Sequence, residues 1–401
     1  MLTERQLFLS YLGQTSPTPL MLEIVRAEGL YMYDPEGRKY LDLISGVSVS
    51  NTGHCHPRVV EAVSRQAASY MHLMVYGEVI QSPQVRYAEF LAGFLPENLR
   101  CTYFVNSGSE AVEGAIKLSR RFTGKSKIVS FRNAYHGSTT GALSVQGSES
   151  FRGPFRPLLP DTWQAVFNDS DSLEIIDDKT ACVIVEPVQG EAGIIFPRSG
   201  FLEALREKCN VTGALLVFDE IQTGFGRTGK MFAIDKFGVV PDILLLAKAL
   251  GGGMPLGAFI SSGKIMSALA SDPPLGHITT FGGHPVCCAA GLASMQVLSE
   301  EGLVVKCSMK SELFKKMLLH KIIREVRGEG LFLAVRLSDP QYIGYVVGKA
   351  PDYGLILDYF LFCSDAFRIA PPLIITDEQI VWAAEQLLKL LDDAEKNVKL
   401  K

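Results

Sequence analysis

The feature that most constrains the fold is an alternation of strand and helix patterns from about residue 58 to residue 290. Short apolar runs of strand length are separated by segments whose apolar residues recur at helical spacing. This alternation is typical of an α/β fold with a mostly parallel sheet between helices, in which ligands bind beyond the carboxyl ends of the strands. The expected strands are 101–105, 127–131, 181–185, 214–218, 242–247 and 258–261.

The two ends of the chain predict a smaller α+β unit. Short strands are expected at 22–25, 30–33 and 39–43, and the tail mixes helix with short strands before a last helix over 377–397. We therefore expect three parts, which are an N-terminal arm with part of the small domain (1–57), a large ligand-binding domain (58–294) and the rest of the small domain (295–401).

Composition excludes several classes of partner. The 401 residues carry 39 basic and 43 acidic side chains, and this balance gives no reason to expect nucleic acid or an anionic membrane. No apolar run reaches the ~18 residues of a membrane span, and the N-terminus lacks the order of a signal peptide. The eight cysteines are scattered, which suits reduced thiols in the cytoplasm.

Lys248 stands at the end of an expected strand, shortly before three glycines, Gly251 to Gly253. Glycine permits positive φ and a close approach of the backbone to a ligand. Burial lowers the pKa of a lysine and makes its amine a nucleophile towards an aldehyde. The alternative is a lysine whose side chain reaches past the strand end to solvent.

Two further stretches follow strand ends. Ser107 and Glu110 form a capping-box pattern, and with Gly108 the free amides of that helix start suit a phosphate. Tyr135 lies where an aromatic ring can stack on a flat ligand. Taken alone, an ordinary helix cap and a buried tyrosine are the simpler interpretations.

Asp219 ends another apolar strand, where an ionised carboxylate needs a cation or a metal. The glycines that follow match G-x-G-x-x-G, but we reject a dinucleotide loop. Polar residues separate the strand from the glycines, no helix pattern opens at Gly229, and Ala249 stands where an acidic residue is required.

Two pairs of ionisable residues have competing interpretations. Glu186 and Glu191 could be acid and base, but we favour a solvated loop. His54 and His56 could bind a metal, but an H-x-H pair alone is a weak signal. We favour a polar bend there and predict no metal site.

Together these features require a flat ring with a phosphate, a basic ring nitrogen to face Asp219 and an aldehyde to meet Lys248. Pyridoxal 5′-phosphate (PLP) has this chemistry. Metal-dependent hydrolysis fits worse, because it needs several clustered ligands and no lysine.

Motifs of one family run along nearly the whole chain. They are Tyr40-Leu-Asp-Leu, Gly53-His-Cys-His-Pro, Asn106-Ser-Gly-Ser-Glu, Tyr135-His-Gly, Glu186-Pro-Val-Gln-Gly-Glu, Asp219-Glu-Ile-Gln-Thr-Gly-Phe-Gly-Arg-Thr-Gly, Lys248-Ala-Leu-Gly-Gly-Gly, Thr279-Thr-Phe-Gly-Gly-His-Pro and Arg368-Ile-Ala-Pro-Pro-Leu. Through them the sequence closely resembles the class-III PLP aminotransferases, the group of the ornithine, acetylornithine and 4-aminobutyrate enzymes. The resemblance implies fold type I, as in aspartate aminotransferase, and a homodimer with active sites at the subunit interface.

The resemblance also implies roles at the cofactor. Lys248 resembles the Schiff-base lysine that later moves the substrate proton, and Asp219 the residue that keeps the ring nitrogen protonated. Gln222 resembles the partner of the ring hydroxyl, and Tyr135 the stacking aromatic. The phosphate seat would consist of Ser107, Gly108 and Ser109, completed by the partner subunit's Thr280.

For substrates, Arg368 resembles the arginine that grips the α-carboxylate of glutamate or 2-oxoglutarate, and Glu191 resembles its switchable partner. Two positions depart from the ornithine-type pattern. Ser138 stands in place of an arginine that binds the far carboxylate, and Val47 in place of a tyrosine of ornithine aminotransferase. These differences argue against a carboxylate clamp in that half of the pocket, and Val47 indicates a more apolar donor.

We therefore expect a PLP aminotransferase that moves an amino group from an ω-amine or amino acid to 2-oxoglutarate, or pyruvate, by ping-pong half-reactions. One alternative is a fold-type-I aminomutase or decarboxylating transaminase, and another is a non-catalytic scaffold. The intact Lys248, Asp219 and Gln222 argue against the scaffold.

Overall fold

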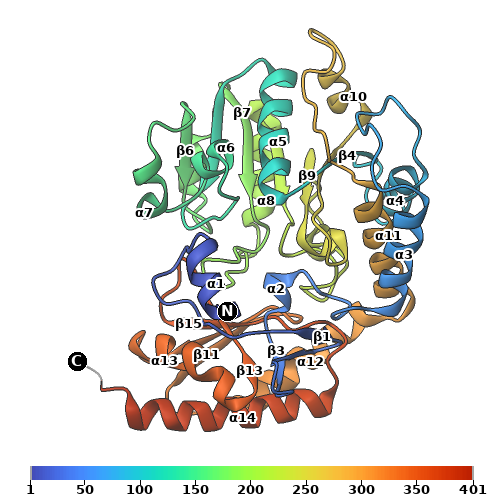
Figure 1. Cartoon of the computed structure of the whole chain (residues 1–401). Helices are drawn as coiled ribbons and strands as arrows, with labels where there is room; N and C mark the ends of the chain where they lie inside the picture. The colour runs from blue at the N-terminus through green and yellow to red at the C-terminus, as the bar shows by residue number, and fades with distance from the viewer. Residues whose placement is uncertain (1, 400–401) are drawn as a thin grey trace.

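A seven-stranded sheet forms the centre of the larger, upper part of the chain in Figure 1, a computed structural model that describes residues 2–399. The five strands β6, β5, β7, β8 and β9 are neighbours in that order and pair in parallel. Strand β10 runs antiparallel to both β9 and β4. The expected mostly parallel sheet is confirmed. Its strands, in spatial order, are β4 (Cys101–Val105), β10 (Gly257–Ser261), β9 (Ile243–Leu246), β8 (Leu215–Asp219), β7 (Thr180–Val185), β5 (Lys127–Phe131) and β6 (Thr162–Ala165).

The central strands are continuously apolar because helices cover both faces of the sheet. In β7, Cys182 and Ile184 belong to the cluster that includes α5 (Gly108–Thr123), whereas Val183 and Val185 belong to the cluster that includes α8 (Phe201–Thr212). Alternate side chains of one strand therefore serve two separate cores.

The two ends of the chain come together in the lower part of the molecule (Figure 1). One four-stranded sheet has the order β1 (Arg26–Glu28), β2 (Tyr31–Tyr33), β3 (Lys39–Asp42) and β13 (Leu355–Ile356), with β13 parallel to β3. The other is antiparallel, in the order β11 (Ile323–Gly328), β12 (Leu333–Leu337), β15 (Ala366–Ile369) and β14 (Asp358–Tyr359). We propose the small domain on this basis, with the expected boundaries at 57 and 294.

The expected strand at 22–25 is wrong. These residues have no regular secondary structure, and β1 begins only at Arg26. Leu22 and Ile24 instead line a groove shared with α1 (Glu4–Tyr11), and the Val25 amide donates to the Tyr33 carbonyl oxygen at 2.9 Å, just before β1 begins.

Helices complete both parts. Those beside the large sheet are α3 (Pro57–Ser69), α4 (Ser82–Ala92), α6 (Thr140–Ser144), α7 (Glu149–Arg152), α9 (Ala233–Phe237), α10 (Gly263–Met266) and α11 (Pro285–Glu300). Helices α12 (Leu303–Met317), α13 (Gln341–Lys349) and α14 (Asp377–Asn397) lie with the lower sheets. Within residues 2–399, none of the helices has the length and apolar character needed to cross a membrane.

Arg227, from the rejected G-x-G-x-x-G stretch, joins the two parts of the molecule. Its buried guanidinium donates to the carbonyl oxygens of Leu331 (2.9 Å) and Pro371 (2.6 Å), to the hydroxyl of Ser45 (3.1 Å) and to the side chain of Asn51. Burial lowers its pKa to about 10. One side chain therefore joins three segments that are far apart in the sequence.

Candidate active site

A cavity of about 490 Å³ opens at the carboxyl ends of the parallel strands. Residues predicted from four separate stretches of the chain line it together, which are the turn at 107–109, Tyr135, the pair Asp219 and Gln222, and Lys248. Glu186 also lines the cavity, whereas Val47, Glu191, Thr280 and Arg368 do not. The strand ends therefore assemble one site from most of the predicted cofactor residues.

The turn at 107–109 forms the start of α5. Ser107 is the N-cap, and its hydroxyl accepts a hydrogen bond from the Glu110 amide at 3.2 Å. The Glu110 carboxylate accepts from the Asn106 amide instead of the Ser107 amide, so the capping box is only half formed. The amides of Gly108 and Ser109 have no partner within the helix and are available to an anion.

Asp219 has a buried partner that we did not single out from the sequence. His136 Nδ1 lies 2.7 Å from the Asp219 carboxylate, and both side chains are almost fully buried. Burial alone lowers the pKa of His136, but the hydrogen bond and charge of Asp219 raise it overall. The signal was present, because His136 follows β5 at the same sheet edge where Asp219 ends β8.

The loop carrying Glu186 and Glu191 is buried, so the interpretation as a solvated loop is wrong. The Glu186 carboxylate accepts hydrogen bonds from the amides of Tyr135 and Gly190, both at 3.1 Å. Burial raises the pKa of Glu186 to about 7. The loop is buried because its carboxylates have internal partners, which sequence spacing did not indicate.

Lys248 lies at the start of a short 3₁₀ turn, Lys248–Gly251, and lines the cavity. Burial lowers the pKa of its amine, and Glu191 and Arg368 are close enough to influence it. Its backbone has φ of 53°, a left-handed conformation that costs a non-glycine residue about 1–3 kcal/mol. Strain of this kind is common at functional sites, where the surrounding structure holds the residue in place.

Gln222 presents an unused donor. Its side chain is buried, and within residues 2–399 its Nε2 has no hydrogen-bond partner. The residue lines the cavity, so an acceptor on a bound group would satisfy this donor.

Arg368 and Glu191 form a buried ion pair, with Nη2 and Oε1 2.5 Å apart. The other Glu191 oxygen accepts from the Leu361 amide at 3.1 Å. A charged pair this deeply buried is strongly coupled, because removing either partner leaves an uncompensated charge.

The remaining predicted residues lie farther from the cavity. Val47 lies in a left-handed turn, in which Ser45, Val47 and Ser48 have φ of 45°, 63° and 65°. Val49, two residues on, lines the cavity in its place. Thr280 is exposed, and Ser138 is exposed with its amide donating to Ser109 Oγ at 3.1 Å.

One histidine of the suggested metal pair, His54, contacts a buried carboxylate. His54 Nε2 lies 2.8 Å from a carboxylate oxygen of buried Asp42. The other oxygen of Asp42 accepts from the amides of Ile44 and Ser45, both at 2.8 Å. These contacts support the turn that carries Val47.

Comparisons with known proteins agree on one family. The family model described as aminotransferase class-III matches residues 12–391. The acetylornithine aminotransferase of Methanopyrus kandleri is 42% identical over 373 residues, covering 92% of this chain and 94% of that protein. The ornithine aminotransferase of Toxoplasma gondii has a TM-score of 0.89 at 32% identity, covering 99% of this chain and 97% of that one. A PLP-bound amine transaminase from an uncultivated Pseudomonas species has a TM-score of 0.87 at 27% identity, covering 96% of this chain and 98% of that one.

Proposed function

Because this chain belongs to the class-III aminotransferases and is a PLP-dependent transaminase, we propose that its donor is an ω-amine or amino acid and its acceptor 2-oxoglutarate or pyruvate. One observation carries this proposal. Arg368 is buried against Glu191, and both side chains are close enough to Lys248 to affect the pKa of its amine. The aminomutase, decarboxylating and scaffold alternatives are not favoured by the family or by the relatives.

The cavity residues fit PLP. The free amides at the start of α5 suit its phosphate, the unpaired donor of Gln222 suits its ring hydroxyl, and Asp219 suits its ring nitrogen. Tyr135 lines the same cavity and would stack on the ring. When bound, PLP supplies an aldehyde that takes up the amino group and a ring that accepts electrons.

Lys248 would hold PLP covalently and move the proton of the substrate Cα. Its lowered pKa favours the neutral amine, which can accept a proton. Asp219 would stabilise positive charge on the ring nitrogen, and its bond to His136 fixes the orientation of the carboxylate.

The donor is tested by a panel of amines and amino acids. Loss of the visible absorbance of lysine-bound PLP, with no keto acid present, reports the first half-reaction alone. We expect the fastest response from an ω-amine without a second carboxylate, because Ser138 supplies no cationic group. An N-acylated ornithine as the fastest donor would instead place the chain with relatives named acetylornithine aminotransferase.

Arg368 and Glu191 give a prediction for the two half-reactions. Arg368→Ala should slow the reaction with 2-oxoglutarate by about 10²-fold or more, because a bidentate contact to the carboxylate is lost. The rate with an ω-amine should change much less. Glu191→Ala should leave Arg368 free, so that α-amino acids improve as donors at the expense of ω-amines.

Single-turnover rates for both half-reactions measure this asymmetry. Arg324→Ala is the matched control, because Arg324 is exposed on β11 of the same sheet. Equal slowing of both halves by Arg368→Ala would make the arginine structural and reject its role as a carboxylate receptor.

We propose a cytoplasmic homodimer in which the partner subunit's Thr280 completes the phosphate seat. Thr280 is exposed, is absent from the cavity of its own chain, and is flanked by the exposed apolar residues Ile278 and Phe281. A partner subunit that covers this segment would remove these two apolar side chains from water.

Subunit mixing tests this arrangement. Lys248→Ala and Thr280→Asp proteins should each be inactive, but after exchange about a quarter of all sites would combine both intact residues. Recovery of about that share of wild-type activity supports sharing. No recovery, after mass spectrometry confirms exchange, means that both residues act within one chain.

A further inference from the structure

A second carboxylate, which we did not identify from the sequence, faces Arg368. Asp358 on β14 lies directly opposite Arg368 on β15 in the antiparallel pair. Its Oδ2 is 3.9 Å from Arg368 Nη1. Within residues 2–399, Arg368 Nη1 and Nε have no hydrogen-bond partner, so Nη1 is free to bind another oxygen. One buried guanidinium therefore faces two carboxylates, Glu191 and Asp358.

The two carboxylates are held in different ways. Asp358 is part of a strand, and its Oδ1 accepts from the Tyr359 amide at 2.8 Å. The pairing of β14 with β15 keeps its backbone opposite Arg368. Glu191 lies on a loop, and rotation of its side chain breaks only the contacts to Arg368 and the Leu361 amide.

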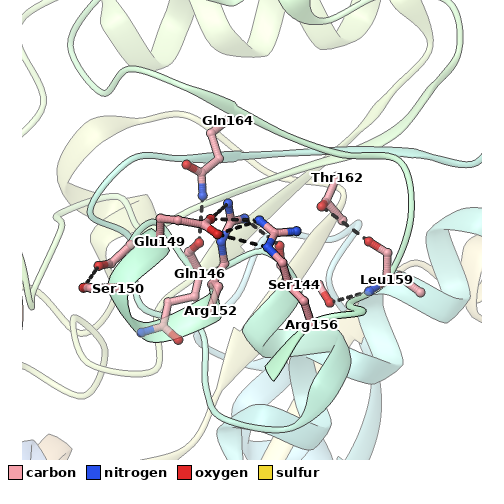
Figure 2. A network of polar contacts seen from close by, with 10 residues as sticks. Ser144, Gln146, Glu149, Ser150, Arg152, Arg156, Leu159, Thr162 and Gln164 are labelled. Carbon is pink, nitrogen blue, oxygen red and sulfur yellow. Dashed lines mark hydrogen bonds and ion pairs between the residues drawn. The ribbon is translucent and has the colours of Figure 1, made fainter. Parts of the chain in front are cut away.

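The segment after Asp358 is also fixed from the large domain. The Phe360 ring lies 4.7 Å from the guanidinium carbon of Arg368, and the Phe362 ring meets Phe151 of α7 edge to face at 5.4 Å. Figure 2 shows the polar network around α7, in which Glu149 accepts from both Arg152 and Arg156. The contact with Phe151 therefore places the segment that follows Asp358 against α7.

The charges have a consequence for substrate choice. When Glu191 leaves, Arg368 still faces Asp358, so an incoming carboxylate meets a neutral pair rather than a free cation. We propose that Asp358 is a specificity-determining residue that weakens the affinity of Arg368 for carboxylate substrates and thereby favours donors without an α-carboxylate. This inference rests on the proposed role of Arg368 as the carboxylate receptor.

The test measures binding of glutarate, an unreactive dicarboxylate, to the PLP-loaded enzyme by calorimetry. Asp358→Asn keeps the shape of the side chain and removes its charge, so glutarate should bind at least about five-fold tighter. Asp358→Glu keeps the charge and should bind glutarate about as the wild type does. Asp352→Asn removes an exposed charge from the same domain and should change nothing.

Kinetics distinguish specificity from a structural role. Asp358→Asn should lower the KM for 2-oxoglutarate with little change in kcat, whereas structural damage would lower kcat and the melting temperature. Equal or weaker glutarate binding by Asp358→Asn would overturn the proposal. If Arg368→Ala bound glutarate as tightly as the wild type, the proposed function of Arg368 would fail, and the inference about Asp358 would fail with it.

Discussion

Lys248→Ala is expected to lower kcat by at least about 10⁴-fold, because one amine would both hold the cofactor and move the substrate proton. The variant should still fold and bind PLP, since the phosphate seat and Asp219 remain. Replacement of Lys248 by alanine keeps the left-handed backbone, so any loss of stability should be small.

Borohydride reduction followed by peptide mapping measures the covalent link. In the wild type the reduced cofactor should be found on Lys248, and in the variant no lysine should carry it. Lys230→Ala is the control, because Lys230 is exposed and does not line the cavity. Finding the label on any other lysine of the wild type would disprove the assignment.

The second large effect concerns Asp219, where the carboxylate would stabilise positive charge on the cofactor ring. Asp219→Ala should lower kcat by at least about 10²-fold, because a preorganised charge in a buried site is lost. Asp219→Asn should retain a hydrogen bond to His136 but lose the charge, so its kcat should fall by a similar factor. Comparing the two variants separates the effect of the lost charge on kcat from the effect of the lost side-chain packing.

Steady-state kinetics with saturating PLP measure this loss, so that weaker cofactor binding does not contribute. Asp178→Ala removes an exposed carboxylate and serves as the control. Turnover within a few-fold of the wild type for Asp219→Asn would rule out a role for the charge.

The large sheet was predictable because its strands are buried on both faces and read as continuous apolar runs. The edge strand β6 was missed, because Trp163 is half exposed and its neighbours Thr162 and Gln164 are polar. The antiparallel direction of β10 could not be predicted, since a run of buried residues carries no information about strand direction.

In the site, residues at strand ends could be predicted because parallel strands bring their carboxyl ends to one edge. Asp358 could not, because its contact with Arg368 depends on the register between β14 and β15. The position of Val47 was equally hidden, because a left-handed turn at a β-branched residue contradicts local preference. Contacts between distant segments, rather than local sequence, decide such positions.

The pairing of β3 with β13 has a consequence for synthesis of the chain on the ribosome. Leu41 needs Leu355 as its parallel neighbour, so the first sheet stays incomplete until nearly the whole chain has been made. During that time β3 exposes an unpaired edge, which is a template for association with other chains. The seven-stranded sheet, whose strands all lie between Cys101 and Ser261, can form earlier. The growing polypeptide can therefore form its central sheet before the sheet that contains its first strands.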